Sequence, residues 1–103
     1  MELIILELDH EEMVEKTTLI HVSLINTIDV INCREYNKCI IAINLYDYNY
    51  SVEYNVNLSY EDVIKLNRYI DEICVENRMA RLDEIVECVI NGWDIKEILR
   101  LKV

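Results

Sequence analysis

The spacing of the apolar residues changes once along this chain, and that change constrains the fold more than any other feature. Apolar and polar residues alternate over 39–47 and 52–58, whereas residues 60–77 carry apolar side chains at every third or fourth position. Alternation is typical of a half-buried strand, and the longer spacing is typical of an amphipathic helix. The sequence therefore predicts strands in its first half and helices in its second.

Two more segments of the first half fit strands. Residues 18–31 alternate over most of their length, and 3–8 is a short apolar run that fits a strand or a helix, of which we prefer the strand. We expect Leu45 to pair with Tyr54 in an antiparallel hairpin, with a four-residue loop at 48–51. The core face of the sheet would carry Ile20, Val22, Leu24, Ile28, Val30, Ile41, Ile43, Leu45, Val52, Tyr54, Val56 and Leu58.

The opposite face of this sheet is expected to be polar. Antiparallel sheets often leave one face in water, and a contact with a partner is the alternative. This face would carry Ala42, Asn44, Tyr46, Glu53, Asn55 and Asn57, with His21, Ser23, Thr27 and Asp29 on the neighbouring strand.

Helix starts are marked by a recurring pattern of a capping residue, an acid three positions later and apolar residues on either side. The pattern occurs as LDHEEM (8–13), LSYEDV (58–63) and WDIKEI (93–98). Such capping boxes with a hydrophobic staple predict helices that begin near residues 10, 60 and 95. Inward positions are expected at Val63, Leu66, Ile70 and Ile73, and at Leu82, Ile85, Val86 and Val89 of a further helix.

The only glycine and the only tryptophan of the chain lie side by side, in NGWD (91–94). Gly92 suits the left-handed residue that closes a helix ending at Asn91. Trp93 would then pack as the staple of the next helix, and Asp94 would cap it. A corner between two helices is the preferred interpretation, and a ligand-binding role for Trp93 is the alternative.

Together these elements predict one α+β domain that spans residues 1–103. Its architecture would be an antiparallel sheet of three to four strands, followed by two to three C-terminal helices packed on one face.

The charge balance limits the partners that the protein can have. Twenty acidic residues against ten basic ones give a formal net charge of −10. Nucleic acids and anionic membranes are bound by basic surfaces, so we expect neither as a direct partner. Cations or basic protein surfaces are the natural partners, unless the acidity only maintains solubility. The N-terminus lacks the basic segment and cleavage site of a signal peptide, so the expected location is the cytoplasm.

Residues for catalysis or metal binding are sparse. One glycine cannot build a phosphate loop in its usual form, and no nucleophile motif is present. Asp9, His10 and Glu12 suit a metal ion but equally suit a capped helix N-terminus. His21 has no convincing nucleophile beside it. We therefore expect no enzyme activity, no metal and no cofactor.

The cysteines form no CxxC pair, and we expect Cys33, Cys39, Cys74 and Cys88 to be thiols. Cys33 and Cys39 flank an expected hairpin loop and would lie close enough to raise the question of a disulfide. Cys74 and Cys88 fall on apolar helix faces, where free cysteine behaves as a small hydrophobic residue.

Acids and tyrosines supply the candidate partner-binding residues. A first acidic group consists of Glu7, Asp9, Glu11, Glu12 and Glu15, and a second of Asp71, Glu72 and Glu76. Carboxylates on a rigid scaffold imitate a row of phosphates and attract a basic groove at long range. Tyr46, Tyr48 and Tyr50 surround the expected hairpin loop, and tyrosine is enriched at protein interfaces.

One segment resembles a known family. NGWDIKEI, preceded by the helical stretch IVECVI, is similar to the helix–Asn-Gly-Trp–acidic segment of small phage anti-CRISPR proteins that inhibit type II RNA-guided nucleases. The resemblance covers about the last third of the chain. It implies an acidic α+β protein that occupies the basic site where the nuclease reads DNA. The segment departs from the family in carrying Lys96, Arg100 and Lys102 in place of acids.

The leading hypothesis is thus a phage anti-CRISPR or anti-defence protein of the DNA-mimic type. Its partner would be a basic nucleic-acid-binding protein such as a CRISPR effector, and it would act in the host cell cytoplasm. An immunity protein or antitoxin that neutralises a basic toxin is the first alternative. A self-associating structural protein of a virus or mobile element, present as a homodimer, is the second.

Overall fold

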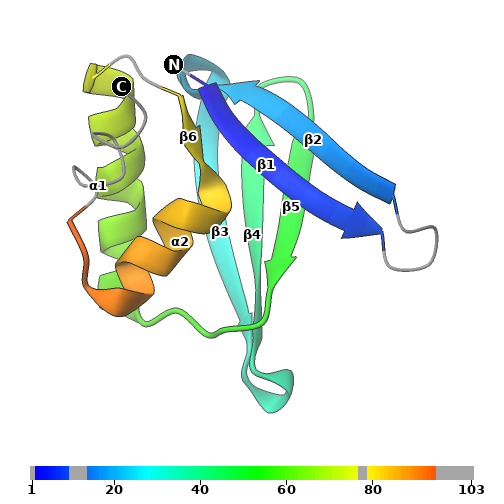
Figure 1. Cartoon of the computed structure of the whole chain (residues 1–103), viewed down its shortest axis with the longest axis vertical. Helices are drawn as coiled ribbons and strands as arrows, with labels where there is room; N and C mark the ends of the chain where they lie inside the picture. The colour runs from blue at the N-terminus through cyan, green and yellow to red at the C-terminus, as the bar shows by residue number, and fades with distance from the viewer. Residues whose placement is uncertain (1, 10–13, 77–78, 95–103) are drawn as a thin grey trace.

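The computed structural model describes residues 2–9, 14–76 and 79–94 (Figure 1). The elements are, in chain order, β1 (Glu2–Asp9), β2 (Val14–His21), the 3-10 turn η1 (Val22–Leu24), β3 (Ile25–Cys33), the 3-10 turn η2 (Arg34–Tyr36), β4 (Lys38–Leu45), β5 (Asn49–Tyr54), α1 (Tyr60–Glu76), β6 (Ala80–Arg81) and α2 (Leu82–Asn91).

The strands form two three-stranded sheets. One is antiparallel throughout, with the order β3-β4-β5. The other has β1 at its centre, antiparallel to β2 and parallel to the short β6. The expected α+β class is confirmed by an antiparallel sheet combined with two helices. The strands of the described residues are more numerous than expected, and they divide between two sheets where one was predicted.

A single apolar cluster joins the inner face of β3-β4-β5 to both helices. Ile41 and Ile43 on β4 lie in it beside Leu66 on α1 and Ile85 on α2, all fully buried. Each buried side chain of this size contributes about 1.5–3 kcal/mol through removal from water. The outer face of the same sheet stays exposed, so the helices cover one face only, as expected.

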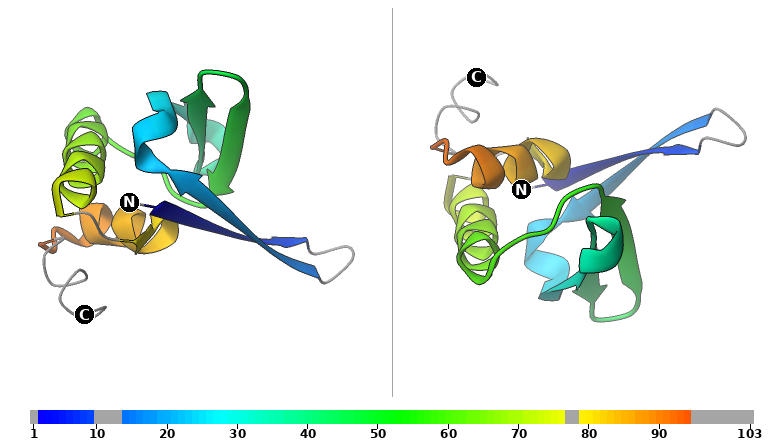
Figure 2. Two further views of the ribbon diagram at one scale, coloured as in Figure 1. Left: turned by 90° about the horizontal axis from the view of Figure 1, so that it is seen from above. Right: turned by 90° about the horizontal axis from the view of Figure 1, so that it is seen from below.

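The helix predicted to begin near residue 10 is wrong. β1 continues to Asp9 and β2 begins at Val14, so the chain on both sides of that position is strand. Residues 10–13, which hold half of the expected cap and staple, lie outside the described residues. The apolar run of β1 gains a partner along its whole length by pairing with β2, and this long-range pairing overrides a local capping pattern. The two strands form a ribbon whose outer end extends away from the helices (Figure 2).

The single strand predicted over 18–31 is divided. Its first part belongs to β2 and its second to β3, in different sheets, with η1 between them. Ile20 and Val22 enter the core as predicted, whereas Leu24 is exposed because the turn breaks the alternation before it.

The β4–β5 pairing is shifted by six residues from the predicted one. Ile43 lies opposite Tyr50 and Ile41 opposite Val52. The loop consists of residues 46–48 in place of the predicted 48–51, and the Leu45 N–H donates to the Tyr48 carbonyl at 2.9 Å across it. The shift is an even number of residues, so the same side chains still face the core. The face assignment is confirmed although the register is wrong.

The described helices follow the predicted pattern. α1 begins at Tyr60 after a capping box, in which the Ser59 N–H donates to Asp62 Oδ2 at 3.0 Å and the Asp62 N–H donates to Ser59 Oγ at 3.1 Å. Leu66, Ile70 and Ile73 are buried and Val63 packs against them, and the four inward positions of α2 are buried as predicted. The strand β6 between the helices was not expected. The helix predicted from residue 95 lies outside the described residues.

The cysteines are free thiols. Cys33 and Cys39 flank the β3–β4 hairpin as predicted, but Cys33 is paired with Lys38 whereas Cys39 is paired with Asn32. Neighbouring residues of a strand point to opposite faces, so Cys33 is exposed while Cys39 is fully buried. Burial raises the pKa of the Cys39 thiol.

Candidate protein-binding surface

The first acidic group lies on the β1–β2 ribbon. Glu7 and Asp9 belong to β1, and the exposed Glu15 belongs to β2 opposite Leu8. The ribbon therefore brings these three positions together at its outer end. Glu11 and Glu12 lie outside the described residues.

A base also lies in this region. Lys16 is the β2 residue opposite Glu7, and its ammonium group stands 5.8 Å from the centroid of the Tyr50 ring. Lys16 thus interrupts the run of acidic positions along the ribbon.

The two described members of the second acidic group point in different directions. Asp71 is exposed, whereas Glu72 is half-buried and its Oε2 atom has no hydrogen-bond partner among the described residues. Adjacent helical residues point in directions about 100° apart. Arg68 lies four positions before Glu72 and hence on the same side of α1. Glu76 is the last residue of α1, and its side chain is outside the description.

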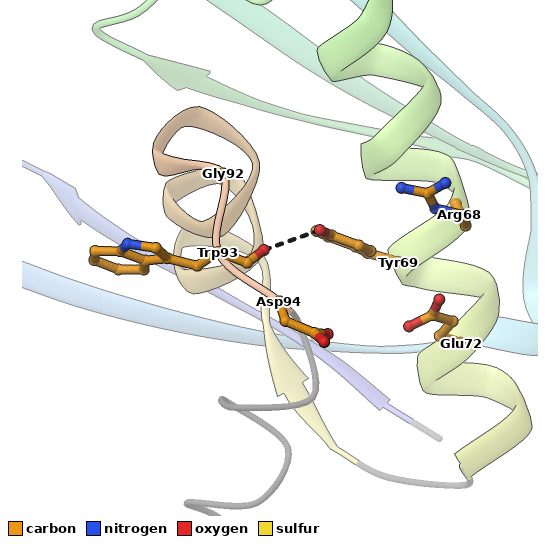
Figure 3. A pocket seen from close by; sticks show the side chains of 6 residues that line it. All are labelled: Arg68, Tyr69, Glu72, Gly92, Trp93 and Asp94. Atoms are coloured by element: carbon orange, nitrogen blue, oxygen red, sulfur yellow. Dashed lines mark hydrogen bonds between the residues drawn. The ribbon is translucent and has the colours of Figure 1, made fainter.

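Glu72 opens onto a hollow of about 400 Å³ between α1 and the chain that follows α2. The hollow is lined by Arg68, Tyr69, Glu72, Gly92, Trp93 and Asp94 (Figure 3). The Tyr69 hydroxyl donates to the Trp93 carbonyl oxygen at 2.9 Å, which ties the corner to α1. The Trp93 indole points away from α1, so the main chain of Trp93, and not its ring, faces the hollow.

The end of α2 has the predicted geometry, whereas the second helix of the predicted corner lies outside the described residues. Gly92 is left-handed, with φ 71°, and the N–H groups of Gly92 and Trp93 both donate to the Cys88 carbonyl. This arrangement closes α2 with a Schellman-type cap. The predicted packing of Trp93 against Ile98 lies outside the described residues.

The three candidate tyrosines divide into two kinds. Tyr46 and Tyr48 are 74% and 54% exposed at the β4–β5 turn. Tyr50 is 9% exposed, and its hydroxyl accepts a hydrogen bond from Thr18 Oγ1 at 3.2 Å. Tyr50 therefore joins the two sheets inside the molecule, and only Tyr46 and Tyr48 offer their rings to a partner.

The outer face of β3-β4-β5 holds part of the predicted polar face. Asn44 Nδ2 donates to Thr27 Oγ1 at 2.9 Å and to Asp29 Oδ2 at 2.7 Å, across neighbouring strands. Glu53 is exposed on β5. Ile31, 56% exposed, also lies on this face although it was not among the predicted members; its neighbour Val30 packs against the core, as alternation predicts.

Other members of the predicted polar face lie elsewhere. A hydrogen bond joins His21 Nδ1 to Ser23 Oγ at the end of β2, which belongs to the β2-β1-β6 sheet. Asn57 follows β5 and donates its side-chain N–H to the Lys38 carbonyl at 2.8 Å. Asn55 is exposed after the end of β5.

Within residues 14–75 and 79–94, no three histidine, cysteine or carboxylate side chains converge as a metal site would require. His10, part of the alternative metal set, is outside those residues. None of the described helices has both the length and the apolar composition to cross a bilayer.

Comparisons with family models, with curated proteins and with solved structures found no match to this chain.

Proposed function

We propose that this protein is a small acidic inhibitor that binds a basic, nucleic-acid-handling protein and blocks the surface on which that partner holds nucleic acid. A phage anti-CRISPR protein that acts on a type II RNA-guided nuclease is its concrete form. The proposal rests on charge: the chain has twenty acids against ten bases, and many of the acids in its described part are exposed.

The exposed acids are largely left without internal neutralisation. Glu15, Asp47, Glu53, Glu61 and Glu87 are exposed and belong to no ion pair within the described part of the chain. Arg81, by contrast, is engaged by two acids, Asp83 at 2.7 Å and Glu84 at 3.8 Å. Unpaired carboxylates on a small protein produce a negative field that attracts a basic groove and speeds encounter with it.

The test is binding and inhibition in one set of conditions. The purified protein is mixed with a guide-loaded type II nuclease, and complex formation and plasmid cleavage are followed as ionic strength rises. We expect a complex at low salt, inhibition of cleavage, and an association rate constant that falls with salt. Absence of both binding and inhibition at low salt would remove the anti-CRISPR form of the proposal.

A matched pair of variants separates the first acidic group from total charge. The first-group variant carries Glu11→Gln, Glu12→Gln and Glu15→Gln. Its control carries Glu35→Gln, Glu61→Gln and Glu87→Gln and has the same net charge. If the first acidic group steers the encounter, the first-group variant associates about tenfold more slowly and the control changes less. Equal effects would mean that only total charge matters.

Self-association is the second candidate, and one observation favours it. β2 is an edge strand of its sheet, and Val14 and Leu19 on it are about half exposed. Free strand edges pair readily with a second chain. Light scattering distinguishes the candidates, because a dimer that forms without the nuclease and persists at high salt supports the structural role.

A further inference from the structure

The outer face of the β3-β4-β5 sheet is a second surface, which neither α1 nor α2 covers. Its positions form rows across the three strands: Thr27 lies beside Asn44, and Ile31 lies beside Ile40, which is followed by Glu53. We call Thr27, Asp29, Ile31, Ile40, Asn44 and Glu53 the outer sheet face.

The polar half of this face is held in place before any partner arrives. The Asn44 amide bridges Thr27 and Asp29 on the neighbouring strand through its two hydrogen bonds. All three residues stand on paired strands, so their side chains lose little freedom on binding. Such preorganisation raises affinity because part of the entropic cost has already been met.

The other half is apolar. Ile31 is 56% exposed and is paired directly with the half-buried Ile40 on the central strand. The exposed Tyr46 and Tyr48 stand at the opposite end of β4, at the β4–β5 turn beyond Asn44. Apolar contact area bordered by polar groups is the usual composition of a protein-binding surface.

The charges on this face select the partner. Asp29 is on one edge strand and Glu53 on the other, so two carboxylates flank the isoleucine pair. The bases at this end of the sheet are Lys38, in the last β3–β4 pair, and Arg34, in the turn η2 that follows β3.

We propose that the outer sheet face binds a protein segment of the basic partner in which arginine or lysine side chains alternate with apolar ones. This inference rests on the proposed function and names the contact surface within it. Arginine from the segment pairs with Asp29 and Glu53, while its apolar residues cover Ile31 and Ile40. Tyr46 and Tyr48 offer aromatic faces that attract the same cations.

The first experiment requires no knowledge of the partner. The isotope-labelled full-length chain is titrated with a synthetic peptide of alternating arginine and leucine, and with the same peptide carrying glutamate for arginine. We expect amide shifts grouped over residues 27–31, 40–44 and 51–53 with the arginine peptide only. Shifts grouped on β2 or α1, or no binding of the arginine peptide, overturn the inference.

The second experiment uses variants that keep the fold. The face variant combines Asp29→Asn, Ile31→Ser and Glu53→Gln, all at exposed positions. Its control combines Glu61→Gln, Glu87→Gln and Val75→Ser, which removes the same charge and one exposed apolar side chain on the helices. We expect peptide binding about tenfold weaker for the face variant and nearly unchanged for the control. Equal weakening of both variants overturns the inference.

The guide-loaded nuclease then separates the two proposals. Nuclease binding that survives in the face variant contradicts the outer sheet face but leaves the proposed function intact. Peptide shifts on the face without any nuclease binding support the face and contradict the anti-CRISPR form of the function.

Discussion

The side chain of Asn32 holds the main chain of Leu58 with two hydrogen bonds. Asn32 Nδ2 donates to the Leu58 carbonyl oxygen at 2.7 Å, and the Leu58 N–H donates to Asn32 Oδ1 at 3.0 Å. The Asn32 side chain thus makes the hydrogen bonds that a neighbouring strand would make to the Leu58 main chain, which lies after the end of β5. It fixes the fully buried Leu58 one residue before the cap of α1, and so aligns the helix with the core.

Replacing Asn32 with Ala removes both bonds and leaves two partly buried backbone groups unpaired. We expect the free energy of unfolding to fall by about 2 kcal/mol, since each unsatisfied buried group costs on the order of 1–3 kcal/mol. Urea unfolding followed by circular dichroism measures the change. The exposed Asn55→Ala is the control, with an expected loss below about 0.5 kcal/mol. Equal losses would show that the amide does not hold the segment.

The tyrosines at the β4–β5 hairpin should separate by stability. Tyr50→Ala empties a core position between the two sheets, and we expect a loss of about 3–5 kcal/mol, as for other large aromatic side chains. Tyr50→Phe removes only the group that Thr18 contacts and should cost about 1 kcal/mol. Tyr46→Ala should cost less than about 0.5 kcal/mol. Thermal unfolding tests the order, which similar losses for Tyr46→Ala and Tyr50→Ala would contradict.

Gly92→Ala tests the cap of α2. A Cβ atom added at Gly92 would meet no atom within 4 Å, so the cost of the substitution comes from the positive φ alone. We expect a loss of about 1–2 kcal/mol in the free energy of unfolding, and a smaller loss for Gly92→Asn, because asparagine tolerates the left-handed conformation better. A neutral Gly92→Ala would mean that the corner adopts another conformation in solution.

The thiols should react in the order of their exposure. We expect iodoacetamide to alkylate Cys33 under native conditions, whereas Cys39 stays protected until the β3–β4 hairpin opens. Peptide mass spectrometry measures the modification at both sites. Rapid native modification of Cys39 would contradict the β3–β4 register.

Stability should also fall at alkaline pH. Burial raises the pKa of Cys39 above its ordinary value of 9.0, so above that pH the folded state holds a proton that the unfolded chain has lost. The free energy of unfolding must then decrease as pH rises beyond about 9. Urea unfolding at several pH values checks the slope. Cys39→Ala should reduce it, and an unchanged slope in this variant would assign the effect to other groups.

Features encoded by neighbouring residues were predictable. The Ser59–Asp62 capping box and the Gly92 cap of α2 each depend on a few consecutive residues, and both formed as expected. The inward faces of α1 and α2 followed from spacing alone. Local hydrogen bonds and periodicity suffice for such features.

Features that depend on distant residues were not predictable. A shift of the β4–β5 register by six leaves the same residues facing inward, so the hydrophobic pattern cannot distinguish the two registers. The DHEE segment looks like a helix start, and only the pairing of β1 with β2 shows that strands flank it. The role of Asn32 cannot be read from the residues around it, because its hydrogen-bond partner is the backbone of Leu58, far along the chain.

The candidate site was predictable in composition and not in arrangement. Charge counts identified the acids, but only the strand pairing shows that Glu15 shares its end of the ribbon with Glu7 and with Lys16. Likewise, alternation identified Asn44 and Asp29 as polar-face residues, whereas the exposure of Ile31 beside them depends on which face the helices cover.

The parallel pair between β1 and β6 sets Leu3 beside Ala80. During synthesis on the ribosome, the β3-β4-β5 hairpins can form as soon as they emerge, since their partners are close in sequence. β1 can pair early with β2 but receives its second neighbour only when β6 has been translated. Until then, β1 has one free edge that another nascent chain or a chaperone can occupy. The completion of this sheet therefore depends on the time taken to translate α1, and translation speed through α1 should affect the yield of folded protein.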